Sequence, residues 1–381
     1  MNIEIRGIAW NHTRGFLPVA ATAQRFEELY PEIRITWEKR SLQAFADASM
    51  SELAGHFDLV VMDHPHVALA AAQGLLLPFE DWVPAEFLED QSMNSVGVSH
   101  DSYRFDKLQW ALTSDAAAPV TTWREDLFEK YGLFPPRTWE DVLSLARDGF
   151  VTIAAFPIDV LMHSYMFTHA LGHEPFSTDH GIGPADIVAA ALDELRSLIS
   201  LCDAACLGRN PICTAEWMCA AVDDRAAAYC PFAYSYSNYS RPGYAGHVLQ
   251  AGDLVNLGPQ PLCSTLGGAG IAVSVKTKSP RACMDYAMFT ASPEIQRGIY
   301  FEAGGQPGHR SAWIDEKINR ASGNFFRNTL GILDRALCRP KTQGYMAFQD
   351  AASPIAHAAV AGSMGVLGAA REMTRLWRNA Q

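Results

Sequence analysis

The stretch Leu266-Gly-Gly-Ala-Gly-Ile-Ala-Val-Ser-Val-Lys276 decides how this chain folds. A pair of glycines leads into an apolar run of strand length, and two helix-like segments follow at 279–289 and 292–296. The helix that the second segment begins ends at a Gly-Gly-Gln-Pro corner, residues 304–307. Glycine and proline mark the turns, whereas the spacing of apolar residues marks the elements between them. The stretch therefore predicts one strand followed by two helices.

Four earlier segments belong to the same pattern. Residues 57–63 read Phe-Asp-Leu-Val-Val-Met-Asp, and residues 74–82 read Gly-Leu-Leu-Leu-Pro-Phe-Glu-Asp-Trp. Ala-Leu-Thr-Ser-Asp follows at 111–115, and Pro-Arg-Thr-Trp-Glu-Asp-Val-Leu at 136–143. In this order and spacing, the chain resembles the family 1 extracellular solute-binding proteins, which are the sugar-type receptors of ABC importers.

The resemblance implies an α/β, two-lobed periplasmic-binding-protein-like fold of class II with a helical C-terminal region. It places one lobe at 1–112 plus 262–312 and the other at 116–260 plus 313–381, with crossovers near 113–115, 261 and 312. We expect hinge closure around a bound ligand, as in other two-lobed proteins.

The residues support this architecture without reference to any family. Residues 3–10 alternate like a first strand, residues 13–30 have the apolar spacing of a helix, and residues 33–38 read as a second strand. Such βαβ alternation predicts a mainly parallel, doubly wound sheet in the first lobe. The length of 381 residues, 49% of them hydrophobic, suffices for two cores.

Charge and hydropathy exclude several classes of partner. The net charge of −12 and the absence of clustered Lys and Arg argue against a nucleic-acid surface. No apolar run is long enough to cross a membrane, so membrane insertion is not expected. The first strand begins almost at Met1 and leaves no room for an export signal. We therefore expect a periplasmic protein if a leader has been removed, and a cytoplasmic one otherwise.

The eight cysteines contain no Cys-x-x-Cys pair, so a zinc or redox motif is not expected. We expect most of them to be buried and reduced, as small apolar residues. The glycines at 267–270 lack the pattern of a nucleotide-binding loop, and no cofactor is expected.

Ligands of such folds bind at the carboxyl ends of strands and at helix N-termini. Two candidate groups follow predicted strands: Trp10, Asn11, His12 and Arg14 after the first, and Asp63 and His64 after the strand 59–62. The indole can stack on a ligand, Asp63 can bond hydroxyls, and Arg14 can hold a carboxylate. Asn11 or Thr13 could instead only cap the first helix while Arg14 faces water, and Asp63 could only cap the helix that follows it. The two histidines at 64 and 66 suggest a metal site. However, no nearby residues complete a set of metal ligands, and no metal is expected.

A third group lies in the second lobe, where residues 231–243 carry four aromatic side chains. We expect Tyr234, Tyr236 and Asn238 to contact the ligand, with Trp10 opposite Tyr234 or Tyr236, because tyrosines combine a stacking face with a polar tip. Weaker candidates near the crossovers are Ser114, Asp115, Trp123, Gly267, Gly268 and Arg310.

The function that this resemblance implies is capture of a small polar ligand for ABC-type import, with a membrane permease as partner. A sugar or sugar-like polyol suits the aromatic and amide side chains, whereas the histidines and arginines leave a sugar acid or other carboxylate open. The alternative is a cytoplasmic enzyme built on the same fold, with His12, Asp63 and His64 as its acid and base groups. The sequence contains no recognisable catalytic motif, so an enzyme is the less favoured interpretation.

Overall fold

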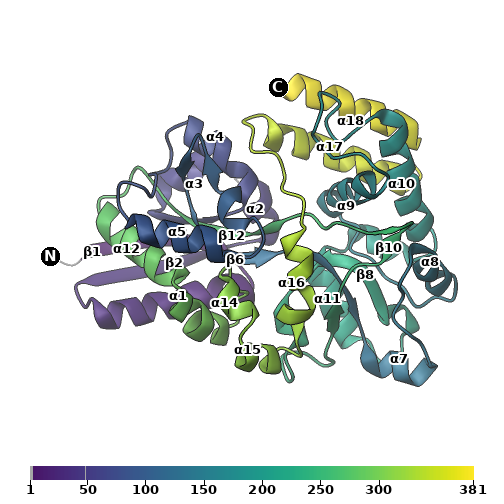
Figure 1. Cartoon of the computed structure of the whole chain (residues 1–381), viewed down its shortest axis with the longest axis horizontal. Coiled ribbons are helices and arrows are strands. Elements are labelled where there is room, and N and C mark those ends of the chain that lie inside the picture. The colour runs from purple at the N-terminus through teal and green to yellow at the C-terminus, as the bar shows by residue number, and fades with distance from the viewer. Residues whose placement is uncertain (1–2, 48) are drawn as a thin grey trace. The chain divides into compact units, whose positions relative to one another are not determined.

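The computed structural model describes residues 3–47 and 49–381 (Figure 1). The chain divides into two compact units. Unit 1 comprises residues 1–117, 266–320 and 341–343, and unit 2 comprises residues 118–265, 321–340 and 344–381. The first and second changes of unit thus lie a few residues beyond the expected crossovers near 113–115 and 261.

The third expected crossover, near 312, is wrong. Residues 313–320 belong to unit 1, as does the short segment 341–343. The Trp313 indole is fully buried and its Nε1 donates to the Pro307 carbonyl at 2.7 Å, while Asn319 Nδ2 donates to the Trp313 carbonyl at 2.8 Å. These contacts hold the segment against unit 1. The chain therefore changes unit five times among the described residues, and not three times.

Unit 1 is built on a five-stranded sheet in the order β2-β1-β3-β12-β6. The strands are β1 (Ile3–Trp10), β2 (Ile33–Arg40), β3 (Leu59–Met62), β6 (Leu112–Ala117) and β12 (Gly267–Val273). β1 pairs in parallel with β2 and β3, whereas β12 runs antiparallel to both of its neighbours. The expected mainly parallel sheet is therefore present, with the returning strand β12 as its one reversed member.

Helices cover both faces of this sheet, and each face buries its own apolar cluster. The larger cluster joins the odd-numbered residues Ile5, Ile33 and Ile35 to the helices α1 (Thr13–Leu29) and α12 (Pro280–Ala291). The smaller cluster joins Ile8 and Val60 to α3 (Met50–His56) and α4 (Val67–Ala72). Successive side chains of a strand point to opposite faces, which explains this division.

The remaining elements of unit 1 are α2 (Leu42–Asp47), η1 (His64–His66), α5 (Ala85–Asn94), α6 (Ser99–Ser102), β4 (Arg104–Phe105), β5 (Leu108–Gln109), α13 (Pro293–Ile295), η5 (Gln296–Tyr300), α14 (Arg310–Trp313) and α15 (Glu316–Ala321), whose last residue lies in unit 2.

Unit 2 combines a small sheet with a large helical layer (Figure 1). Its antiparallel sheet has the order β8-β7-β9, formed by β7 (Pro119–Trp123), β8 (Tyr229–Tyr234) and β9 (Gln250–Gly252). Four helices pack on one another: α9 (Pro157–Ala170), α10 (Ala185–Ile199), α17 (Tyr345–Val360) and α18 (Val366–Ala380). The other elements are α7 (Glu125–Tyr131), α8 (Trp139–Arg147), η2 (Ala204–Gly208), α11 (Pro211–Ala220), η3 (Arg225–Ala227), η4 (Ser237–Ser240), β10 (Asn256–Leu257), β11 (Gln260–Pro261) and α16 (Phe325–Asp334).

None of the helices in the described part of the chain combines the length and apolar character that crossing a bilayer requires. All eight cysteines are free thiols. Four of them are buried (Cys206, Cys219, Cys230 and Cys283), Cys202 and Cys263 are half-buried, and Cys213 and Cys338 are exposed. Burial raises the pKa of the Cys206 thiol to about 11, so this thiol stays protonated at neutral pH.

Candidate functional site

One edge of the unit 1 sheet gathers most of the predicted site residues. β1, β3 and β6 run in the same direction, so their carboxyl ends meet at this edge, and the reversed strand β12 begins there. The edge therefore brings together the segments after Trp10, after Met62 and around Asp115 with Gly267. Carboxyl ends of parallel strands are where open α/β sheets bind ligands.

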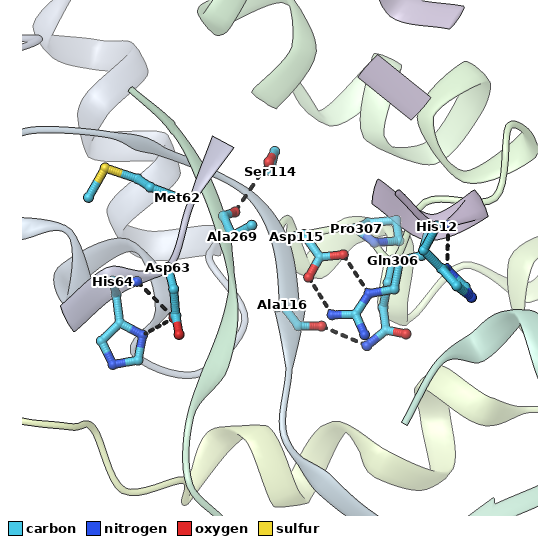
Figure 2. Close-up of polar contacts among 12 residues, drawn as sticks. His12, Met62, Asp63, His64, Ser114, Asp115, Ala116, Ala269, Gln306 and Pro307 are labelled. Atoms are coloured by element: carbon cyan, nitrogen blue, oxygen red, sulfur yellow. Dashed lines mark hydrogen bonds and ion pairs between the residues drawn. The ribbon is translucent and has the colours of Figure 1, made fainter. Parts of the chain in front are cut away.

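His12 stands between β1 and α1 and caps the helix (Figure 2). Its Nδ1 accepts the backbone N–H of Arg14 at 3.0 Å. Burial, and then the neighbouring Arg14 charge, lower the pKa of His12 to about 4, so the ring is neutral at neutral pH. Because Nδ1 is an acceptor in this ring, the proton lies on Nε2, which is then a donor. The capping role that the sequence left open for Asn11 or Thr13 thus falls to His12.

Asp63 and His64 follow β3 and turn the chain into the short helix η1. Asp63 Oδ1 accepts the backbone N–H of His64 at 2.8 Å and lies 3.3 Å from the Nδ1 atom of the same histidine (Figure 2). The His64 ring is buried and meets the Tyr103 ring edge to face, with their centroids 6.3 Å apart. Asp63 therefore caps η1 with one oxygen, and its carboxylate has further lone pairs that can accept hydrogen bonds.

Arg14 and Asp115 bind each other. Arg14 Nε donates to Asp115 Oδ2 at 2.8 Å and Nη2 donates to Asp115 Oδ1 at 2.5 Å, and both side chains are buried. Burial raises the pKa of Asp115, and the Arg14 guanidinium opposes that rise. The expectation that Arg14 holds a ligand carboxylate needs correction, because the planar fork is engaged by a carboxylate of the protein. The pair fastens the start of α1 to the end of β6.

The expectation that the Trp10 indole contacts the ligand also needs correction. It is only 4% exposed and belongs to the larger apolar cluster of unit 1, with its ring centroid 5.0 Å from that of Phe45. A Cβ on Gly15 would come within 2.3 Å of the indole, so helix α1 packs directly on it. An indole in this position stabilises the fold. Trp10→Ala should therefore destabilise the fold, because large-to-small changes of aromatic residues in a core cost about 3 to 5 kcal/mol.

The two glycines among the candidates near the crossovers pair β12 with β6. Gly268 has a φ of +119° and pairs with Ala116, next to the bulge that β12 makes between Ala269 and Gly270. Gly267 pairs with Ala117, and Ser114 Oγ donates to the Ala269 carbonyl at 3.2 Å (Figure 2). Arg310 is the half-buried first residue of α14.

The predicted contacts of unit 2 lie at the carboxyl end of β8. Tyr234 is its last residue, and its hydroxyl forms a hydrogen bond with Thr265 Oγ1 at 2.9 Å. Tyr236 and Asn238 are buried in the turn that follows. Tyr234, Tyr236 and Tyr239 line a small cavity together with apolar residues of α11 and α16.

Trp123 is at the opposite end of this sheet. β7 runs antiparallel to β8, so that Pro119 pairs with Tyr234 while Trp123 pairs with Tyr229. At about 3.3 Å per residue, this separates Trp123 from Tyr234 by roughly 13 Å along the strands. The structure therefore does not bring Trp123 together with the tyrosine group, and its indole Nε1 donates to Glu125 at 2.6 Å.

The sequence analysis missed Arg40, the last residue of β2, at the same edge of the unit 1 sheet. The sequence pattern ends the strand at Glu38, whereas β2 continues for two more residues to Arg40. The position of Arg40 close to the end of a predicted strand was the sequence feature that could have identified it.

In the residues that the structure describes, no group of three or more His, Cys, Asp or Glu side chains has the geometry to hold a metal ion.

Comparisons with known proteins show which proteins this chain is similar to. Residues 9–149 match the family model described as bacterial extracellular solute-binding protein. The mannitol-binding protein of Pseudomonas aeruginosa is 32% identical over 141 residues, which cover 36% of this chain and 31% of that protein. The match thus spans about a third of this curated relative.

Solved structures extend the likeness over the whole chain. The maltose-bound MalE3 of T. maritima has a TM-score of 0.83 at 16% identity, covering 100% of both chains. An ABC transporter solute-binding protein from Agrobacterium radiobacter K84 in complex with ribitol also has a TM-score of 0.83, at 18% identity, covering 99% of this chain and 98% of that one. The chain thus resembles the bacterial extracellular solute-binding proteins over residues 9–149 and shares the fold of these solved structures along its whole length. The resemblance seen in the sequence is confirmed, and the matched family consists of binding proteins and not of enzymes.

Proposed function

We propose that this protein acts as a solute-binding protein, which captures a sugar or sugar-like polyol and delivers it to an ABC-type permease. The observation that carries the proposal is the convergence of His12, Asp63 and His64 at the carboxyl edge of the unit 1 sheet. The relatives that bind mannitol and ribitol support the choice of ligand class.

The edge offers the hydrogen-bonding groups that a hydroxyl-rich ligand needs. Asp63 supplies a charged acceptor, whereas neutral His12 supplies a donor at Nε2. Each hydroxyl both donates and accepts, so a mixed set of this kind suits it. Tyr234, Tyr236 and Asn238 of unit 2 remain predicted ligand contacts.

We further propose that the protein binds its ligand without turnover and works outside the cytoplasmic membrane, where a permease receives its cargo. The competing enzyme would use His12, Asp63 and His64 as acid and base. In the structure, His12 and Asp63 each cap a helix, which supports a positioning and binding role.

A thermal-unfolding screen against sugars and alditols, including mannitol, ribitol, tagatose and maltose, tests this function. At a concentration of about 100 times its Kd, a ligand should stabilise the protein by roughly 2.7 kcal/mol, and the midpoint should rise accordingly. The ligand should be recovered chemically unchanged after prolonged incubation. Conversion of the ligand by the protein would favour the enzyme, and the absence of a shift with every sugar and alditol would contradict the proposed ligand class.

A further inference from the structure

Arg40 is placed to meet whatever binds at the carboxyl edge of unit 1. It pairs in register with Trp10 at the end of β1, and its carbonyl accepts the backbone N–H of Asn11 at 2.7 Å. The first candidate segment of the site therefore begins directly beside it.

The guanidinium extends across the end of the neighbouring strand. Arg40 Nη2 donates to the Val61 carbonyl at 2.7 Å, and Nη1 donates to the Ala44 carbonyl at 3.4 Å. Because β1 lies between β2 and β3, a side chain that starts on β2 and reaches Val61 of β3 must span β1. The guanidinium carbon lies over the Phe45 ring, 5.2 Å from the ring centroid. Val61 lies two residues before Asp63, so the cation reaches the centre of the edge.

Arg40 differs in its ion pairing from the other arginines of the sheet and of α1. Arg14 is paired with Asp115, Arg6 with Glu38 and Arg34 with Glu27. Among the side chains that the structure describes, none forms an ion pair with Arg40, and none accepts a hydrogen bond from its buried Nε. Burial alone lowers the pKa of Arg40 to about 10, so the group is still charged at neutral pH.

A charge in this environment costs free energy unless an opposite charge meets it. Two backbone carbonyls occupy one N–H of each Nη atom, which leaves three of the five donors, including Nε–H. A planar carboxylate matches two adjacent donors of such a fork. The nearby Asp63 carboxylate favours a ligand with a single negative charge and hydroxyl groups over a more highly charged anion.

We propose that Arg40 binds the carboxylate of a sugar acid, an aldonate, whose hydroxyl groups bond Asp63 and His12. This inference rests on the proposed capture of a hydroxyl-rich ligand and specifies its class. The acid end lies over β1 beside β2, and the hydroxyl chain points toward the end of β3.

Calorimetric titration of the intact protein with two matched pairs tests the inference: D-mannonate against D-mannitol, and D-ribonate against ribitol. Each pair differs only in whether one terminal carbon is a carboxylate or an alcohol. Hydrogen bonds to a charged partner predict that at least one acid binds about tenfold or more tighter than its alditol.

The variant Arg40→Gln removes the charge and should abolish that preference, weakening the acid about tenfold or more while changing the alditol Kd by less than about threefold. Arg40→Lys keeps the charge but loses the planar guanidinium, so it should retain part of the preference for the acid. This variant replaces Arg40→Gln in the test if Arg40→Gln does not fold. Arg34→Gln, on the same strand but paired with Glu27, is the matched control and should change neither Kd.

The outcomes separate the inference from the function on which it rests. An alditol that binds as tightly as its acid in the unaltered protein overturns the inference and leaves polyol capture standing. Equal weakening of acid and alditol in Arg40→Gln assigns Arg40 a structural role and also overturns it. Failure of every alditol, sugar and sugar acid to bind overturns the proposed function itself.

Discussion

Replacing Arg14 by Met will destabilise the protein by about 3 to 5 kcal/mol, because it leaves the Asp115 carboxylate buried without its partner. The Asp115 side chain has no exposed surface, and both of its oxygens accept from Arg14. Water cannot replace that partner without opening the junction between α1 and β6. Urea unfolding of the parent and Arg14→Met measures the loss.

Arg6→Met is the matched control for this variant. Arg6 also pairs with a carboxylate, Glu38, but their side chains are 54% and 48% exposed. Solvent screens such a pair, and its removal should cost at most about 1 kcal/mol. If Arg14→Met loses no more stability than Arg6→Met, the buried pair does not hold α1 on the sheet, and our interpretation of Arg14 as structural is wrong.

Replacing Gly268 by Ala will destabilise the protein by about 3 kcal/mol or more. The residue has a φ of +119°, and a Cβ would lie 2.3 Å from the Asp115 carbonyl oxygen. The strained backbone alone costs about 1 to 3 kcal/mol, and the clash with a strand of the same sheet adds to it. Thermal unfolding of the variant measures the combined cost of the strained backbone and the clash.

Gly172→Ala separates the two contributions. Gly172 has a similar φ of +91°, but a Cβ there would meet no atom within 4 Å. This control should therefore show the backbone cost without the clash. A Gly268→Ala variant no less stable than Gly172→Ala would mean that β12 is not tightly packed against β6, and that Gly268 serves the ligand and not the sheet.

The elements of this fold were predictable because each depends on local patterns. The segment 136–143 contains the start of α8 (Trp139–Arg147), where Thr138 and Asp141 form a capping box, a motif that the residues Thr-Trp-Glu-Asp indicate locally. The glycine-led strand at 267–273 was equally visible. Its glycines give the turn, and its apolar run gives the buried strand.

The partners of the site residues were not predictable, because they are remote in sequence. Arg14 and Asp115 are 101 positions apart, and nothing in either segment shows that they meet. Trp10 ends an alternating strand, and that pattern is the same whether its indole packs on Gly15 or contacts a ligand. The misplacement of Trp123 has the same origin, since it depends on the antiparallel pairing of β7 with β8, more than 100 residues later.

The sequence did predict which edge of the unit 1 sheet carries the candidate site, namely the edge at which the parallel strands end. Asp63 and His12 were selected because each follows a predicted strand, and the parallel arrangement of β1 and β3 brings both to one edge. Arg40 obeys the same rule and was missed only because its strand is two residues longer than expected. Positions after parallel strands are thus the most informative guide to the site.

The central claim is that this edge of unit 1, and not the sheet as a whole, holds the ligand. β3 offers a direct comparison, because Asp58 precedes the strand and Asp63 follows it. Asn at position 63 keeps an oxygen for the His64 N–H and removes only the charge. Asn at position 58 likewise keeps an acceptor for the Arg6 N–H at the opposite edge.

Calorimetric titration of Asp63→Asn and Asp58→Asn with the tightest ligand from the screen is therefore the most direct test. We expect Asp63→Asn to raise the Kd about tenfold or more, since a hydrogen bond to a charged group contributes about 1.5 to 3 kcal/mol, and Asp58→Asn to leave it unchanged. A ligand that binds Asp63→Asn as tightly as the parent, or that is weakened equally by both variants, would contradict the assignment of the site to this edge.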